Sequence, residues 1–150
     1  MSWGVRFGDG GTTVKNDEMS EAVTSMNSEV WSGLIPDPGS PGFSVRTTYP
    51  TNADGVEVML ERWDAGTEEP PHFHPGDDMT VVVEGRMSVQ FYRTVGESLI
   101  ADGAPVQFAK GDVGYVRAQR IHDAKYPENC QLVYVHDGAF AFNRVNLVVA

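Results

Sequence analysis

Short apolar runs alternate with polar residues along most of this chain, and clusters of glycine, proline, asparagine and aspartate separate them. Runs of this kind are typical of strands, and their regular spacing over residues 43–148 predicts an all-β sandwich or barrel of antiparallel strands. A hairpin is expected first, with strands 43–49 and 56–63 joined by the turn-rich segment PTNADG. The next segment, AGTEEPP at 65–71, is expected to be a loop.

The rest of the chain keeps the same rhythm. MTVVV and RMSVQFY flank a tight turn at Glu84 and Gly85, and residues 95–118 are expected to hold two short strands around their DG and KGD turns. IHDAKY and QLVYVHD form a further pair, turned at PENC. The chain shows no βαβ alternation, no glycine-rich phosphate loop and no G-x-S-x-G sequence. The enzyme classes that these features mark are therefore disfavoured.

The N-terminal part has a different pattern. Residues 3–7 are expected to form an edge strand, and residues 17–28 the one helix, because apolar residues recur there at helical spacing. The segment IPDPGSPG at 35–42 is incompatible with a helix or a central strand. We therefore predict an N-terminal extension over 1–42 and a β barrel over 43–150.

Composition narrows the choice of partners. The net charge of −10 over 150 residues disfavours nucleic acid and anionic membranes as partners. Cys130 is the one cysteine, which excludes an intrachain disulfide and fits a reducing compartment. No secretory signal and no apolar run long enough to span a membrane stand out, so we expect a cytoplasmic protein.

Two of the four histidines stand in the segment PPHFHPGDDMTVVVEG. Side chains alternate across a strand, so His72 and His74 share one face and can converge on one ion, whereas only one of Asp77 and Asp78 can point the same way. Imidazole suits Zn, Cu, Fe and Ni, and a carboxylate adds affinity for Mn. Two histidines alone make a weak site, and a polar entry to a strand is the competing interpretation.

The spacing around these histidines resembles the first motif of the cupin superfamily, which reads Gly, five residues, His-x-His, three or four residues, Glu, six residues, Gly. Gly66, His72, His74 and Gly85 keep this spacing, and Asp78 stands where the family has glutamate. The second motif reads Gly, five residues, Pro-x-Gly, two residues, His, three residues, Asn. It keeps two of its residues and loses three, as the sequence G111-DVGYV-R117-A-Q119-RI-H122-DAK-Y126 shows.

The resemblance, which covers roughly residues 43–140, implies a single-domain (RmlC-like) cupin. The fold would be a small double-stranded β-helix, or jelly-roll barrel, with a short N-terminal helix and flanking strands. Its metal ligands would be His72, His74, Asp78 and His122, holding one divalent transition metal ion per chain, with iron first and Mn, Ni, Zn or Cu as alternatives. Asp78 is shorter than glutamate and could lie outside the metal's ligand set, and Arg117 and Gln119 could change the turn before His122.

The resemblance also orders the possible functions. A metal-dependent enzyme acting on a small organic molecule comes first, as a non-haem metal dioxygenase or a related isomerase or lyase. The alternatives are a non-catalytic small-molecule-binding or sensor cupin, and a metal-free epimerase-type cupin with His72 or His122 as base and a tyrosine as acid. The flanking helix and the aromatic segment GAFAFN would cover the barrel or pair with a second copy, so we expect a homodimer.

Several other residues are candidates for the pocket. Tyr126 is a candidate catalytic or substrate-touching residue, although a wall residue is the favoured interpretation. Tyr134 and His136 share one strand face, which lines the cavity or faces solvent, and we favour solvent. One of Glu61 and Arg62 must face inward, and a buried charge needs a partner. Four acids near the histidines form either a negative rim or a solvated loop: Glu68, Glu69, Asp77 and Asp78.

Overall fold

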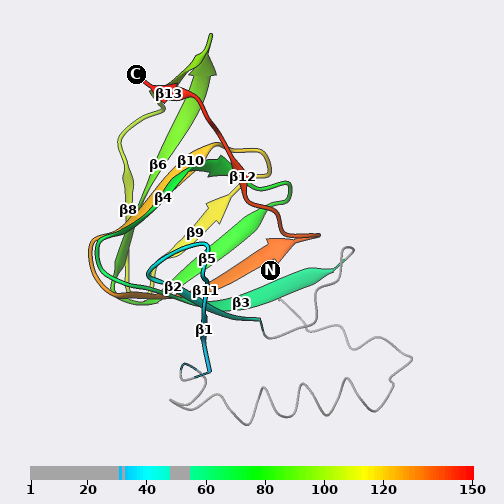
Figure 1. Cartoon of the computed structure of the whole chain (residues 1–150), viewed down its shortest axis with the longest axis vertical. Coiled ribbons are helices and arrows are strands. Elements are labelled where there is room, and N and C mark those ends of the chain that lie inside the picture. Colours follow the sequence, from blue (N-terminus) through cyan, green and yellow to red (C-terminus); the bar gives the residue numbers. More distant parts are fainter. Residues whose placement is uncertain (1–30, 32, 48–54) are drawn as a thin grey trace. The chain divides into compact units, whose positions relative to one another are not determined.

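The computed structural model describes residues 31, 33–47 and 55–150 (Figure 1). The edge strand expected at 3–7 and the helix expected at 17–28 lie outside these residues. The compact unit described below comprises Leu34–Ala150. Its described part is built from strands and turns, which confirms the all-β prediction. Among the described residues, no helix has the length and hydrophobicity needed to cross a membrane.

Two curled sheets make up this unit. The first has the order β1-β2-β3-β11-β5-β9, and all its pairs are antiparallel. Its strands are β1 (Ile35–Pro36), β2 (Phe43–Thr47), β3 (Val56–Trp63), β11 (Cys130–Asp137), β5 (Asp78–Glu84) and β9 (Val113–Val116). The proline-rich segment thus contributes only a two-residue edge strand, as its missing N–H groups require.

The second sheet has the order β12-β4-β10-β6-β7-β13, and β8 also pairs with β6. Its strands are β12 (Asn143–Arg144), β4 (Thr67–Phe73), β10 (His122–Tyr126), β6 (Arg86–Val95), β7 (Ser98–Ala101), β13 (Val148–Val149) and β8 (Val106–Ala109). All its pairs are antiparallel except β13 with β7. Three short strands (β7, β8 and β9) occupy 95–118, where the pattern predicted two.

The loop expected at 65–71 is wrong from Thr67 onward, because β4 begins there. Two prolines, Pro70 and Pro71, lie within this strand at a β-bulge. Between the paired positions His122↔His72 and Ala124↔Glu69, β10 advances by two residues and β4 by three. A bulge tolerates residues that cannot donate to the ladder, and the free carbonyl of Pro71 accepts instead from the backbone N–H of Val145 at 2.9 Å.

Aromatic and aliphatic side chains fill one end of the space between the sheets. Trp63 on β3 stacks on Tyr126 of β10, with ring centroids 4.4 Å apart, and Phe43 of β2 stacks on Trp63 from its other side at 4.2 Å. Val82, Met87, Cys130 and Leu132 are among the buried residues of the same cluster. This cluster forms an apolar floor, and the residues above it on the inner faces line a cavity.

Candidate metal centre

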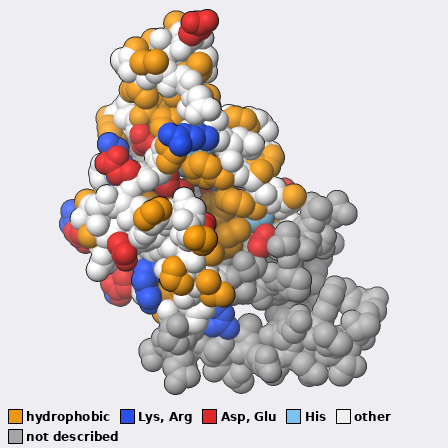
Figure 2. Space-filling view, in the orientation of Figure 1, with side chains coloured by type: hydrophobic (Ala, Val, Ile, Leu, Met, Phe, Trp, Pro, Cys, Tyr) orange, Lys and Arg blue, Asp and Glu red, His pale blue; other side chains and the backbone are white. Residues whose placement is uncertain are grey.

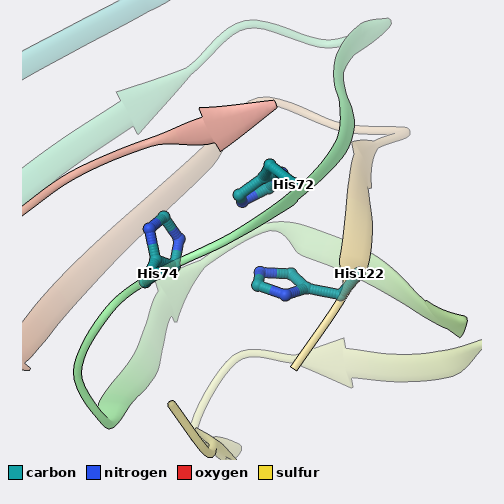
Figure 3. A group of neighbouring side chains, drawn as sticks. All are labelled: His72, His74 and His122. Carbon is teal, nitrogen blue, oxygen red and sulfur yellow. The ribbon is translucent and has the colours of Figure 1, made fainter. Parts of the chain in front are cut away.

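Three histidines from neighbouring segments point toward one another (Figure 3). His72 lies at the end of β4, His74 just after it, and His122 opens β10, where its Cα pairs with that of His72. Figure 3 shows the three rings converging between these strands. One nitrogen atom from each ring lies within 4.8 Å of the others. The structure therefore brings together the three histidines that the two motifs singled out.

Hydrogen bonds fix which ring nitrogen is available in each case. The Nδ1 atom of His72 lies 2.7 Å from the carbonyl oxygen of Pro70, that of His74 lies 2.9 Å from Ala141 O, and that of His122 lies 2.8 Å from Arg120 O. A carbonyl oxygen only accepts, so each Nδ1 carries the proton and donates. Each Nε2 then keeps its lone pair, as a metal-ligating histidine requires.

Burial keeps the rings neutral. His72 is 1 % exposed, and His74 and His122 are also buried. Desolvation, together with the neighbouring His122, lowers the pKa of His72 to about 3. Desolvation likewise lowers the pKa of His74 to about 4 and that of His122 below its usual value. Three neutral imidazoles with inward lone pairs are well placed to bind a transition metal ion.

Asp78, the residue predicted as a fourth ligand, opens β5 and lines the same cavity. It does not belong to the group whose donor atoms converge within 4.8 Å. Burial raises its pKa to about 7. Asp78 and Tyr134 are close enough to shift each other's pKa, yet Asp78 Oδ2 and the Tyr134 hydroxyl have no hydrogen-bond partner among the described residues. Both atoms are thus buried with unused hydrogen-bonding capacity.

The turn before His122 keeps an unusual backbone conformation. Gln119 stands where the second motif has glycine, and its φ is 66°, in the left-handed region that favours glycine. Among the described residues it is the only non-glycine with positive φ. Its backbone N–H donates to the carbonyl of His74 at 2.9 Å. Gln119 therefore adopts the left-handed conformation itself, at the cost of backbone strain.

Two further carboxylates line the cavity. Glu61 rather than Arg62 faces inward, and its Oε2 accepts a hydrogen bond from the Trp63 indole at 3.0 Å. Glu69 accepts one from the Tyr126 hydroxyl at 2.7 Å. Burial raises the pKa of Glu61 to about 8 and that of Glu69 to about 7. The bulge at Pro70 and Pro71 explains why Glu69 faces the cavity. It puts Glu69 and His72, which are three residues apart on β4, on the same face.

The predicted acidic rim is thus split between the cavity and the surface. Glu69 and Asp78 line the cavity. Glu68 is exposed beside Lys125, with 3.6 Å between Oε1 and Nζ, and the Asp77 carboxylate accepts from the Tyr115 hydroxyl and the Ala118 N–H. Of the four acids, only Glu68 and Asp77 belong to the solvated surface.

The remaining pocket candidates also separate. Tyr126 and Tyr134 line the cavity. His136 is buried beside them but does not line it, and its Nε2 lies 3.1 Å from Glu57 Oε2, with both side chains almost fully buried. The interpretation of Tyr134 and His136 as a solvent-facing row is therefore wrong. The strand that carries them, β11, lies between β3 and β5 rather than at a sheet edge. Tyr134 and His136 are on its buried face.

Two aromatic residues that motif analysis did not place cover the histidines. Phe142 stacks on His72, with ring centroids 4.1 Å apart, and Phe140 lies 5.1 Å from His74. Both remain about two-fifths exposed. The same segment supplies the Ala141 carbonyl that accepts from His74. The segment 138–143 therefore both orients and shields the triad.

The cavity has a volume of about 350 Å³, at the lower end of the range for small-molecule sites. Its polar lining comes from the histidines, acids and tyrosines described above, and its wall is largely apolar, with residues such as Val89, Val106 and Phe108. In the space-filling view, hydrophobic side chains gather in the middle of the visible face, and histidine surface is visible beside them (Figure 2). The arrangement suits a small, partly apolar organic ligand.

Comparisons with known proteins bear on the fold. No protein-family model matches the chain, and no curated protein matches it either. Solved structures do match. A cupin superfamily protein from Desulfitobacterium hafniense is 16% identical with a TM-score of 0.53, over 69% of this chain and 83% of that one. An RmlC-like cupin protein from Ralstonia eutropha is 21% identical with a TM-score of 0.55, over 73% and 65%.

The salicylate 1,2-dioxygenase of Pseudoaminobacter salicylatoxidans also matches, at 18% identity and a TM-score of 0.55, over 83% of this chain but only 31% of that larger one. Identities this low establish shared architecture and nothing about substrate. They agree with the two-sheet barrel and with the motif spacing. This chain therefore has the cupin fold.

Proposed function

We propose that the protein binds one divalent transition metal ion through the Nε2 atoms of His72, His74 and His122 and acts as an enzyme on a small organic molecule. A non-haem metal dioxygenase is the first candidate, and a related isomerase or lyase the second. One observation carries the proposal: all three Nδ1–H groups donate to backbone carbonyls, which leaves each Nε2 lone pair available in a triad whose ring nitrogens lie within 4.8 Å of one another. Iron is the first candidate metal, followed by Mn, Ni, Zn and Cu.

Such an ion, when bound, would activate dioxygen or polarise a carbonyl of the substrate. The protein's own groups would do the rest. The backbone carbonyls hold the three rings in one tautomer, Phe140 and Phe142 limit access of water, and the apolar wall receives the hydrocarbon part of a substrate. The Tyr134 hydroxyl, which has no hydrogen-bond partner among the described residues, would hydrogen-bond to the substrate, and Asp78 would serve as a fourth ligand or orient a bound group.

The two alternatives make different demands on these residues. A metal-free acid–base enzyme would need a competent base and acid, but desolvation lowers the pKa of His72 to about 3 and raises that of Tyr126 well above its usual value. His72 is therefore better suited to metal binding than to proton transfer, and Tyr126 is a poor acid near neutral pH. A sensor or binding protein would keep the metal or the cavity without turnover.

Metal content tests the proposal. Protein purified without chelators should contain about one equivalent of a first-row transition metal by plasma mass spectrometry, and His74→Ala should lose it. His136→Gln is the matched control, because His136 is buried outside the cavity lining and should leave the metal content unchanged. Metal retained in His74→Ala would refute the ligand set. Metal without oxygen consumption or turnover on small carbonyl and enol compounds would favour the sensor alternative.

Assembly and location are proposed on sequence grounds alone. We propose a homodimer, which sedimentation velocity would test, because exposed strand edges need covering. We also propose a cytoplasmic protein, because its single cysteine fits a reducing compartment, and one without nucleic-acid or membrane partners, because its composition is acidic.

A further inference from the structure

The metal proposal leaves Glu61 and Glu69 without a role. Each of these carboxylates lines the cavity and uses one oxygen on a fixed donor, the Trp63 indole for Glu61 and the Tyr126 hydroxyl for Glu69. Neither belongs to a group of converging metal-ligand atoms in the described part of the chain, where the histidine triad is the only such group. A second metal ion therefore does not account for them.

The strand register gives their level in the barrel. The Trp63–Tyr126 stack joins the two sheets at the floor. Glu61 lies two residues before Trp63 on the same face of β3, and Glu69 pairs with Ala124, two residues before Tyr126 on β10. His122 lies a further two residues away along β10. The two acids therefore form a layer between the aromatic floor and the histidine triad.

This layer lacks a cationic partner among the residues that the structure describes. No lysine or arginine is among the described residues that line the cavity. Two buried carboxylates that share a cavity are costly unless a cation or a proton compensates them. Accordingly, burial and mutual repulsion with Asp78 raise the pKa of both groups. A positively charged guest that binds here would take the place of these protons, because it favours the ionised form of both acids.

An independent feature indicates that a ligand occupies this space. Tyr134 is 8 % exposed and lines the cavity, yet its hydroxyl makes no hydrogen bond of normal geometry to any described residue, the neighbouring Asp78 included. Buried hydroxyls in folded proteins are almost always partnered. A ligand that lies between the triad and the carboxylate layer would supply the missing partner.

We propose that Glu61 and Glu69 form a subsite for an organic cation, so that the substrate carries an ammonium or guanidinium group at the end remote from its metal-binding group. The inference rests on the proposed function, because the metal site fixes where the other, metal-binding end of the substrate would lie. The cation would lie in the carboxylate layer, the metal-binding end at the triad, and a short hydrocarbon segment against the apolar wall formed by residues such as Val89 and Phe108.

Calorimetric titration with two isosteric probes tests this subsite. Phenethylammonium and 2-phenylethanol have the same number of non-hydrogen atoms and differ in charge, and neither contains an anionic group that could bind a metal. The protein is used as purified, with its metal content measured on the same samples. The variants are Glu61→Gln, Glu69→Gln and the double variant. Glu68→Gln is the matched control, since Glu68 is exposed and pairs with Lys125 at the surface.

We expect the wild type to bind the ammonium at least tenfold more tightly than the alcohol. The double variant should reduce this preference to about twofold or less with unchanged affinity for the alcohol, which also shows that the cavity is intact. Glu68→Gln should behave as wild type. Equal or tighter binding of the alcohol, no ammonium binding at millimolar concentration, or an undiminished preference in the double variant would overturn the proposal. The wild-type comparison needs no variant to fold.

The measured metal content separates this inference from the proposed function. A preference for the ammonium in protein that holds no metal, even after reconstitution, would support the subsite and refute the metal-dependent activity. A stoichiometric metal without the preference would do the reverse.

Discussion

Replacing Glu61 with glutamine should change how the stability of the protein depends on pH. Burial raises the pKa of Glu61 from 4.5 to about 8, so the folded protein holds this proton more tightly than the unfolded chain. The group therefore contributes stability that is complete below pH 4.5 and is lost as the pH rises through about 8. Glutamine has nearly the same shape, accepts the same hydrogen bond from Trp63, and does not titrate.

The size of the effect follows from these two pKa values. At about 1.4 kcal/mol per pKa unit, the wild-type protein should lose roughly 3 kcal/mol of unfolding free energy through this group between about pH 5.5 and about pH 8.5. This loss is large beside a total stability of about 5–15 kcal/mol. Because Glu61 is only 8 % exposed, solvent screens it little.

Urea unfolding of chelator-treated protein at the two pH values measures the difference. Glu61→Gln should lose about 3 kcal/mol less than wild type over this interval, by the same linkage relation. Glu68→Gln, with its side chain in solvent, should follow the wild type. If Glu61→Gln and wild type lose the same free energy to within about 0.5 kcal/mol, Glu61 ionises in the folded protein without cost and the argument from burial fails.

Four other substitutions test the site and its frame. Gln119→Gly should raise the unfolding free energy by about 0.5 kcal/mol in urea titrations, because glycine adopts the left-handed conformation at φ 66° without strain. An unfolding free energy below that of the wild type would contradict the strain at Gln119. Gly85→Ala should lower it by ~3 kcal/mol or more, since the added Cβ would lie 2.0 Å from the Asn129 carbonyl oxygen. Gly96→Ala, with positive φ but open space, should cost only about 1 kcal/mol. Phe142→Ala should weaken metal binding about fivefold in competition with a chelator, because the ring stacked on His72 contributes ~1 kcal/mol; an unchanged affinity would show that the stack does not orient His72.

The histidine triad was predictable from sequence because its spacing survives in both motifs. Alternation also correctly gave β3 its bounds, Val56–Trp63. Periodicity does not state which face is internal until the neighbours of a strand are known. Glu61 therefore remained an alternative to Arg62, and the face of Tyr134 and His136 was misjudged.

The carboxylate layer was harder to foresee for a local reason. Strict alternation from His72 places Glu69 on the opposite face, and the bulge at Pro70 and Pro71 reverses this. The prolines themselves suggested a loop, since they cannot donate to a sheet. The signal that could have found the bulge is the same pair of prolines directly before a motif whose first histidine must face inward.

The three acceptors that orient the histidines are main-chain atoms, the carbonyls of Pro70, Arg120 and Ala141. No point substitution at these positions deletes a carbonyl. Evolution can therefore exchange the side chains at 70, 120 and 141 as long as the path of the chain persists. The tautomers of the triad are inherited with the topology, and the surrounding sequence is free to drift while the coordinating geometry is retained.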